Sequence, residues 1–173
     1  MNSYERTIWT VLRLSFGWVF LWAFLDKLLG LGLSTCRDKV TGVVTNMCDA
    51  AWISGGSPTT DFLTDATQGP LANIFQAMAN LPVVDWLFMI GLAGIGIALL
   101  LGVLTRIAVA SAVVLMLLMY IAVIPPSSNP FVDYHIIYAL TLLLLAPHVT
   151  ETSFSFSKWW SKQPVVKQMP WLR

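Results

Sequence analysis

The stretch IWTVLRLSFGWVFLWAFLDKLLGL, residues 8–31, decides the fold of this chain. The hydrocarbon core of a bilayer is about 30 Å thick, so a helix needs roughly 20 mostly apolar residues to cross it. This stretch is long enough and predicts a membrane-spanning helix. It nevertheless contains Arg13, Asp26 and Lys27, and a charge at the centre of such a helix costs about 2.5–3.5 kcal/mol. Each of these side chains therefore needs the headgroups, a partner or a polar cavity.

Two interpretations of these charges remain open. Arg13 and Lys27 lie about four helical turns apart and share one side of the helix, whereas Asp26 points about a quarter-turn away. In the first interpretation, Arg13 extends to one headgroup layer while Asp26 and Lys27 reach the other, as long side chains near helix ends do. In the second, the charges form a functional polar seam within the membrane.

The composition is that of a membrane protein. Hydrophobic residues make up 57% of the 173 residues and charged residues only 11%, against about 25% charged residues in soluble domains. Because no long polar linker divides the chain, we expect a single domain over residues 1–173. The net charge is +1, and no basic cluster with interleaved aromatic residues is present. The sequence thus predicts an integral membrane protein that contacts lipid and no nucleic acid.

Three further apolar runs predict membrane spans at residues 83–104, 107–124 and 131–147. The connection between the first two runs is so short that they must form an antiparallel hairpin. The proline-rich segment PPSSNP, residues 125–130, ends the next run. The predicted fold class is therefore an all-α membrane protein, a four-transmembrane-helix bundle with a long, partly helical extracytoplasmic loop after helix one.

The run at 83–104 carries small residues at intervals of four, namely Gly94, Ala98 and Gly102. Small residues at this spacing let two helix backbones approach closely, which is a main source of helix packing in lipid. We therefore expect this stripe to face a neighbouring helix, and we prefer this structural interpretation to a ligand-binding role.

The connection over residues 33–82 is far longer than the roughly 4–6 residues of a typical loop, so it has structure or a function of its own. Within it, Pro70 opens the segment PLANIFQAMANL, whose apolar residues recur every three or four positions. This pattern predicts a short amphipathic helix over residues 70–80, which lies on the membrane surface or over the bundle.

Basic residues are distributed unevenly between the two sides of the predicted bundle. Arg6, Arg106 and the basic tail after His148 fall on one side, and the long loop falls on the other. The positive-inside rule then predicts a multi-pass protein of the cell membrane with both termini in the cytoplasm.

Both cysteines, Cys36 and Cys48, lie in the long loop. A disulfide persists outside the cytoplasm, and two cysteines allow only one pairing within the chain. In the chain-entropy model, closing a loop of this size stabilises the fold by roughly 3 kcal/mol. We expect the bond to form, with two reduced thiols as the alternative.

Polar and titratable residues gather at the predicted outer face of the bundle. Asp26 and Lys27 lie at the end of the first helix, and Asn129, Asp133, Tyr134 and His135 lie at the start of the fourth. Such a concentration on one face is typical of a binding mouth. His135 stands out because an imidazole transfers protons near neutral pH and hydrogen-bonds to carbonyl groups. The alternative is that His135, beside Asp133, caps a helix or meets headgroups.

Several kinds of cofactor site have no signal in the sequence. His135 and His148 fall on opposite faces of the predicted bundle, so they do not make a haem or metal site. No cysteine cluster for iron and sulfur and no dinucleotide-binding glycine motif is present. We expect no metal and no tightly bound cofactor, so a redox group would be diffusible or belong to a partner.

Four stretches, in order, cover nearly the whole chain: RLSFGWVFLWAFLDK (13–27), WISGGSPTTDFL (52–63) with Gly69 and Pro70, DWLFMIGLAGIGIALLLGVLTR (85–106) and NPFVDYHIIYALTLLLLA (129–146). Together they resemble the DoxX-like membrane family, and within it the DoxD small subunit of thiosulfate:quinone oxidoreductase. The resemblance implies a four-helix membrane subunit. It also implies a second subunit, DoxA-like or another member of a membrane complex, because the short tail has no room for a fused second domain.

Two functional hypotheses follow from the resemblance. In the first, the chain is a membrane subunit of a quinone-linked oxidoreductase and helps to pass electrons from thiosulfate to a diffusible quinone. Its acid–base residues would then be Lys27, His135 and Asp26, its head-group ligands Asp133, Tyr134 and Asn129, and its site the outer mouth between the first and fourth spans. In the second, the chain is a non-catalytic DoxX-like accessory or scaffold subunit of a larger membrane complex.

Overall fold

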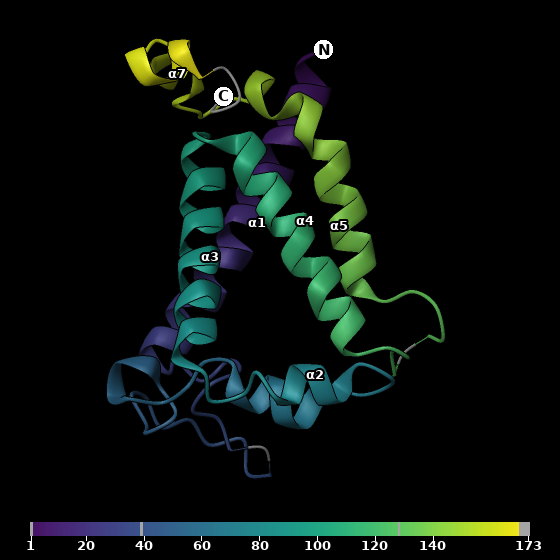
Figure 1. Cartoon of the computed structure of the whole chain (residues 1–173). Helices are drawn as coiled ribbons and strands as arrows, with labels where there is room; N and C mark the ends of the chain where they lie inside the picture. Colours follow the sequence, from purple (N-terminus) through teal and green to yellow (C-terminus); the bar gives the residue numbers. More distant parts are fainter. Residues whose placement is uncertain (1, 39, 128, 170–173) are drawn as a thin grey trace.

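Four apolar helices run side by side through the structure, a computed structural model that describes residues 2–38, 40–127 and 129–169. They are α1 (Ser3–Leu29), α3 (Pro82–Leu101), α4 (Thr105–Ala122) and α5 (Tyr134–Leu145). α1 packs mainly against α3, and α4 packs mainly against α5. The long loop and α2 (Ala72–Gln76) close one end of this bundle, and the α3–α4 turn lies at the other (Figure 1).

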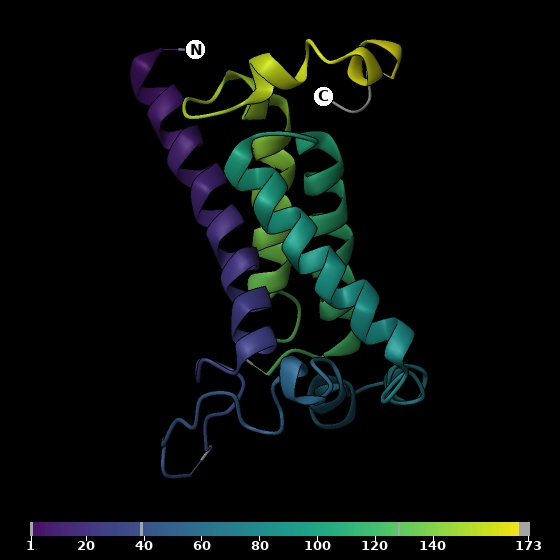
Figure 2. The same ribbon diagram turned by 90° about the vertical axis from the view of Figure 1, so that its left-hand side faces the viewer.

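The remaining helices are short and lie at the two ends of the bundle. They are η1 (Trp52–Ser54) and η2 (Phe62–Ala66) in the loop, then η3 (Ala146–Glu151), α6 (Ser157–Trp160) and α7 (Pro164–Gln168) after α5. Figure 2 shows α6 and α7 lying across the end of the bundle at which α1 begins. Strand-like pairing in the described residues is limited to one isolated bridge between Arg37 and Val44. The predicted all-α fold class is confirmed.

Three helices, α1, α3 and α4, are long and apolar enough to cross a membrane. α5 has 12 residues, which is about 18 Å at the helical rise, and its apolar course continues through η3 to Val149. Length and composition therefore support a membrane environment with three clear spans, and the predicted fourth span is the shortest of the set.

α1 begins earlier than the apolar pattern predicted, because polar residues cap it. The Asn2 side chain accepts a hydrogen bond from the Glu5 amide, and the Glu5 side chain accepts one from the Asn2 amide. This capping box satisfies two of the amides that a helix start leaves free. At the other end, Gly30 takes a left-handed conformation with φ 63° and donates to the Asp26 carbonyl, as the predicted glycine stop requires.

Two glycines set the close approach of α1 and α3. A Cβ on Gly17 would meet the Leu100 amide nitrogen at 2.9 Å, and a Cβ on Gly96 would meet the Leu21 amide nitrogen at 2.7 Å. A Cβ on Gly94 would have nothing within 4 Å. The predicted contact stripe is therefore wrong at Gly94, because the spacing of small residues does not say which face of a helix meets its neighbour.

The hydrophobic core fills the space between the four long helices. Its largest members include Phe16 and Phe20 of α1, Met89, Leu92 and Leu99 of α3, Met116 of α4, and Leu142 and Leu145 of α5. Side chains on the outer faces, such as Trp86, Leu140 and Leu144, are exposed. Apolar outer faces of this kind suit contact with lipid.

The second half of the long loop is tied to the end of α4. The backbone amide and side chain of Gln68 donate hydrogen bonds to the carbonyls of Ala122, Val123 and Pro125. Gly69 follows with φ 77°, and a Cβ there would collide with a carbonyl of the same segment. α2 then covers only part of the predicted helix over residues 70–80, and turns complete the rest.

Candidate functional site

An apolar cavity of about 180 Å³ lies at the loop end of the helices, beside Lys27. α3 contributes Val84 and Phe88 to its wall, α4 contributes Leu115, Leu118, Met119 and Ala122, and the loop contributes Pro58, Thr59, Phe62, Leu63, Phe75 and Met78. Lys27 is the only charged side chain among the described residues of this lining. The cavity thus combines an apolar, aromatic-rich wall with one cation.

Asp85 in the first turn of α3 holds the cover of this cavity in place. Its buried carboxylate accepts hydrogen bonds from the hydroxyls of Ser57, at 2.8 Å, and Thr59, at 2.6 Å. The turn that carries these hydroxyls leads directly into η2, which brings Phe62 to the cavity. Asp85 is therefore a positioning residue that the sequence reasoning missed.

Lys27 lies between this apolar cavity and a polar one. Its Nζ donates to the Ser34 hydroxyl at 3.1 Å, and no carboxylate of the described residues is within 4 Å of it. On the loop side, the same side chain lines a polar cavity of about 1000 Å³ that also contains Asp61 and Thr60. The ammonium group can therefore exchange protons with a water-accessible space while it faces an apolar one.

Asp26, although adjacent in sequence, does not line the cavity at Lys27. It is 1% exposed and accepts four hydrogen bonds: from the amides of Leu33 (2.9 Å), Ser34 (2.9 Å) and Thr35 (3.1 Å) and from the Ser34 hydroxyl (2.7 Å). Four donors stabilise the buried carboxylate, and the carboxylate in turn holds these donors in place. Its evident role is to fold the chain back after α1.

His135 and Asp133 form a buried acid–base pair at the start of α5. The His135 Nδ1 lies 2.6 Å from Asp133 Oδ2, and Asp133 Oδ1 also accepts the His135 and Ile136 amides as a helix cap. His135 shares the buried face of α5 with Ala139 and Leu142. Its Nε2 is buried and has no partner in the part of the chain that the structure describes. If Nδ1 carries the proton toward Asp133, Nε2 presents a free lone pair.

Tyr134 and Asn129 do not lie on the buried face that His135 occupies. Tyr134 is 60% exposed, and its ring lies 4.0 Å from that of His135. The Asn129 side chain accepts hydrogen bonds from the amides of Phe131 and Val132, which stabilises the turn before α5. Neither residue lines the cavity at Lys27.

The structure does not bring the predicted site residues together at a mouth between α1 and α5. The cavity at Lys27 is walled by α3 and α4 and covered by the loop, and His135 is not part of its lining. The reason is that α1 packs on α3 and has little contact with α5. Among the cavity residues, Phe75 and Met78 belong to the amphipathic pattern at 70–80, which was visible in the sequence. Phe88 and Met119 had no such signal, because they lie within uniformly apolar helices.

Arg13 marks the opposite end of the bundle. Its side chain is 0% exposed and donates to the carbonyls of Leu99 and Leu100 in the last turn of α3. It also donates to the carbonyls of Ser153, at 3.0 Å, and Phe154, at 2.9 Å. A cation is stabilised at the negative end of a helix dipole. Arg13 therefore joins α1, α3 and the segment after η3, and its side chain is enclosed by protein.

Cys36 and Cys48 form the predicted disulfide, with a Cα–Cα distance of 5.6 Å. Beside this bond, the exposed Asp38 organises a tight turn. Hydrogen bonds from the Thr41 amide, the Thr41 hydroxyl and the Val40 amide hold the pKa of Asp38 below its ordinary value of 3.8. The first part of the loop is thus held by one covalent bond and by local hydrogen bonds.

Metal ligands do not converge in the described residues, where no group of three or more His, Cys, Asp or Glu side chains could hold an ion. The two histidines lie apart. His135 begins α5, whereas His148 lies in η3 and stacks on Trp9 at 4.6 Å. A histidine pair for a haem is therefore not formed by these two residues.

A scan against protein-family models finds no match for the chain, and searches of curated proteins and of solved structures find none either. One fold hosts many functions, so the chemistry of the site is what indicates the function of this chain. The cavity at Lys27 and the His135–Asp133 pair are its two chemical features.

Proposed function

We propose that this chain is the quinone-facing membrane subunit of an oxidoreductase similar to thiosulfate:quinone oxidoreductase, and a member of the DoxX-like family. One observation carries the proposal, namely the apolar cavity in which Lys27 is the one cation that the described residues contribute to the lining. The four DoxX-like sequence stretches support it independently. The donor of electrons is then a second subunit that oxidises thiosulfate.

The lining of the cavity fits a quinone head group. Such a group is a flat, largely apolar ring with carbonyl oxygens, and pockets for small ligands pair apolar walls with a few polar groups. Phe62, Phe75 and Phe88 offer aromatic surfaces to the ring. The Lys27 ammonium offers a hydrogen bond to a carbonyl oxygen.

Lys27 also has the position of a proton donor. Quinone reduction consumes two protons with the two electrons that the partner subunit supplies, so the site needs a donor and a route for its reprotonation. Lys27 faces the apolar cavity on one side and the polar cavity with Asp61 on the other. Asp26 holds the chain around Ser34, the hydrogen-bond partner of Lys27, and therefore acts as a positioning residue.

The proposal includes the topology of four spans with both termini in the cytoplasm. α5 together with η3 serves as the fourth span, and its apolar residues run from Tyr134 to Val149. The start of α1 and the tail helices lie at one end of the bundle in Figure 2, and the disulfide-bonded loop lies at the other. Basic residues of the tail favour the cytoplasmic side for the first end.

The test is Lys27→Met in the assembled complex, with quinone reduction as the readout. Loss of one buried hydrogen bond costs about 1–3 kcal/mol, so we expect quinone affinity to fall about 10- to 100-fold. Lys27→Arg keeps a donor and should retain part of the activity. Lys162→Met, an exposed change in the tail, is the matched control and should leave the rate unchanged.

His135→Phe distinguishes the role of the His135–Asp133 pair from that of the cavity at Lys27. Because His135 is not in the cavity lining, this change should affect quinone affinity less than Lys27→Met does. Each variant must first show an unfolding temperature near that of the wild type in the same detergent. An unchanged rate for Lys27→Met would refute the quinone site at the Lys27 cavity.

A scaffold role is the second candidate, and one observation favours it. Asp26, Asp133 and Asn129 use their side chains to cap helices or hold turns, which are structural tasks. Purification of the chain from its native membrane distinguishes the candidates. A bound quinone and a redox partner support the first, whereas a stoichiometric place in an unrelated complex supports the second.

A further inference from the structure

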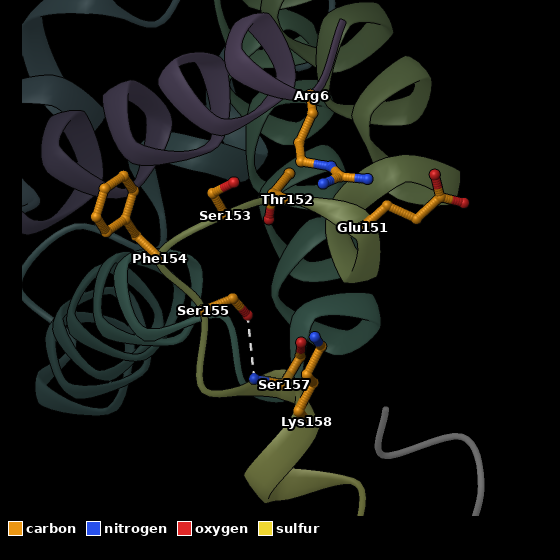
Figure 3. Close-up of a pocket in the computed structure, with 8 residues that line it drawn as sticks. All are labelled: Arg6, Glu151, Thr152, Ser153, Phe154, Ser155, Ser157 and Lys158. Atoms are coloured by element: carbon orange, nitrogen blue, oxygen red, sulfur yellow. Dashed lines mark hydrogen bonds between the residues drawn. The ribbon is translucent and has the colours of Figure 1, made fainter. Parts of the chain in front are cut away.

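A third pocket, which is polar, lies at the end of the bundle opposite Lys27, between the start of α1 and the segment after η3 (Figure 3). Its volume is about 490 Å³. Arg6 of α1 forms one side, and Ser153, Ser155, Ser157 and Lys158 form the other. The proposed quinone function uses none of these residues.

Two cations extend into this pocket from opposite sides. Figure 3 shows the Arg6 side chain reaching down from α1 and the Lys158 side chain reaching up toward it, while Glu151 lies at the edge. No carboxylate in the described ranges comes within 4 Å of either cation. Both positive charges are therefore available to a ligand.

A third positive charge lies directly behind the pocket wall. The buried Arg13 guanidinium holds the carbonyls of Ser153 and Phe154, which belong to that wall. Its other partners, Leu99 and Leu100, are also carbonyls, so no carboxylate neutralises it within the described chain. A buried charge that is met only by dipoles keeps a positive field around it.

Neutral donors complete the lining. The backbone amides of Phe154 and Ser155 make no hydrogen bond to any other described residue, and the Ser153 and Ser157 hydroxyls are likewise without one. Adjacent free amides next to cationic side chains are a common arrangement for holding an oxyanion. Glu151 offsets only one of the three positive charges, so the pocket selects for an anion.

We propose that this pocket binds a phosphate group. A phosphate offers several acceptor oxygens around one centre, which suits two cations from opposite sides together with hydroxyl and amide donors. Two sources share this chemistry: the headgroup of an anionic lipid, and a soluble phosphate. The neighbouring Trp159 is 59% exposed, and an aromatic residue beside basic ones is typical of the headgroup layer.

The experiment measures binding to the full-length protein in a non-ionic detergent, by native mass spectrometry and by calorimetry. One arm titrates phosphatidylglycerol against zwitterionic phosphatidylcholine, and the other titrates inorganic phosphate against chloride at matched ionic strength. Retention of one phosphatidylglycerol with no response to inorganic phosphate assigns the lipid source. Binding of inorganic phosphate that displaces the lipid assigns the soluble source. No preference in either arm overturns the proposal.

Variants separate a defined pocket from a generally basic surface. Arg6→Gln and Lys158→Gln should each weaken binding about fivefold, because each removes a cation at the membrane surface. Lys162→Gln and Lys167→Gln remove the same charge from the tail outside the pocket lining, and should change binding less than twofold. Equal losses in all four variants would show diffuse attraction and overturn the pocket. Arg6 and Lys158 make no side-chain bonds in the described structure, so the folded state should persist, and unfolding temperatures verify this.

Discussion

α1 buries two charges, Arg13 near its middle and Asp26 near its C-terminal end, and it does so in opposite ways. Arg13 is 0% exposed and Asp26 is 1% exposed, and neither forms a salt bridge within the described parts of the chain. Asp26 is neutralised by amides only 7 to 9 residues further along the chain. The Arg13 guanidinium donates its hydrogen bonds to carbonyls 86 to 141 residues away. One charge organises the adjacent loop, and the other organises the whole bundle.

The difference follows from where free backbone groups arise. After a helix stops at a glycine, the next residues present unpaired amides, and a carboxylate in the last turn can collect them. The carbonyls that a cation needs lie at a helix C-terminus, and for Arg13 that terminus belongs to α3. Loss of Arg13 should therefore act globally, and loss of Asp26 should act locally.

Arg13→Met is expected to have the largest effect. It removes the donor of four carbonyl hydrogen bonds, one buried and three partly buried, and hydrogen bonds to charged groups contribute about 1.5–3 kcal/mol each. We expect the free energy of unfolding to fall by about 3 kcal/mol or more, measured by denaturation in a fixed detergent. Arg13→Lys should recover part of the loss, since one ammonium cannot serve both pairs of carbonyls. Arg106→Met, an exposed change, should be near neutral. A similar stability for Arg13→Met and Arg106→Met would contradict the comparison.

Asp26→Asn should lower the free energy of unfolding by about 2 kcal/mol. The asparagine NH₂ group is a donor where the carboxylate had an acceptor, and all four hydrogen-bond partners are donors. Hydrogen exchange is the sharper measurement. The amides of Leu33 to Thr35 should exchange faster, while those in the last turn of α3 should keep their protection. Equal acceleration at both places would mean that the two charges act on one cooperative unit.

Gly96→Ala tests the contact between α1 and α3 that lies between the two charges. The new methyl group would meet the Leu21 backbone, and overpacking costs about 1–3 kcal/mol. The helix preference for alanine offsets about 1 kcal/mol of this, so a net loss of about 1 kcal/mol is expected. Gly94→Ala has open space and should be neutral or stabilising. The prediction fails if the order of the two unfolding temperatures is reversed.

The smallest effect concerns pH at Asp38, an exposed counterpart of Asp26. Its pKa is lowered by hydrogen bonds from Thr41 and Val40, so its contribution is present above the ordinary value of 3.8 and is lost as the pH falls through the lower, folded value. Exchange of the Val40 and Thr41 amides should therefore lose protection below about pH 3.8, after correction for the intrinsic pH dependence of exchange. Asp38→Asn should remove this transition. Its persistence in that variant would assign it to another group.

The sequence pointed to some residues of the candidate site and gave no sign of the others. Lys27 stands out in an apolar stretch, and the amphipathic pattern at 70–80 points to Phe75. Phe88 and Met119 lie in helices that are apolar on every side, so periodicity could not show that they meet at Lys27. His135 and Asp133 were predicted to lie at one mouth with Lys27, but their separation from the Lys27 cavity depends on helix packing.

Local signals were sufficient to predict the long helices and the disulfide, because apolar runs, glycine stops, prolines and shared loops act over a few residues. They were sufficient for Asp26 as well, in principle, since its partners follow within one loop. Three features were decided only by the packing of helices that are distant along the chain. They are the hydrogen-bond partners of Arg13, the glycine of α3 that meets α1, and the walls of the cavity. Such contacts depend on which face each helix turns inward, and in a uniformly apolar helix the sequence carries little record of that choice.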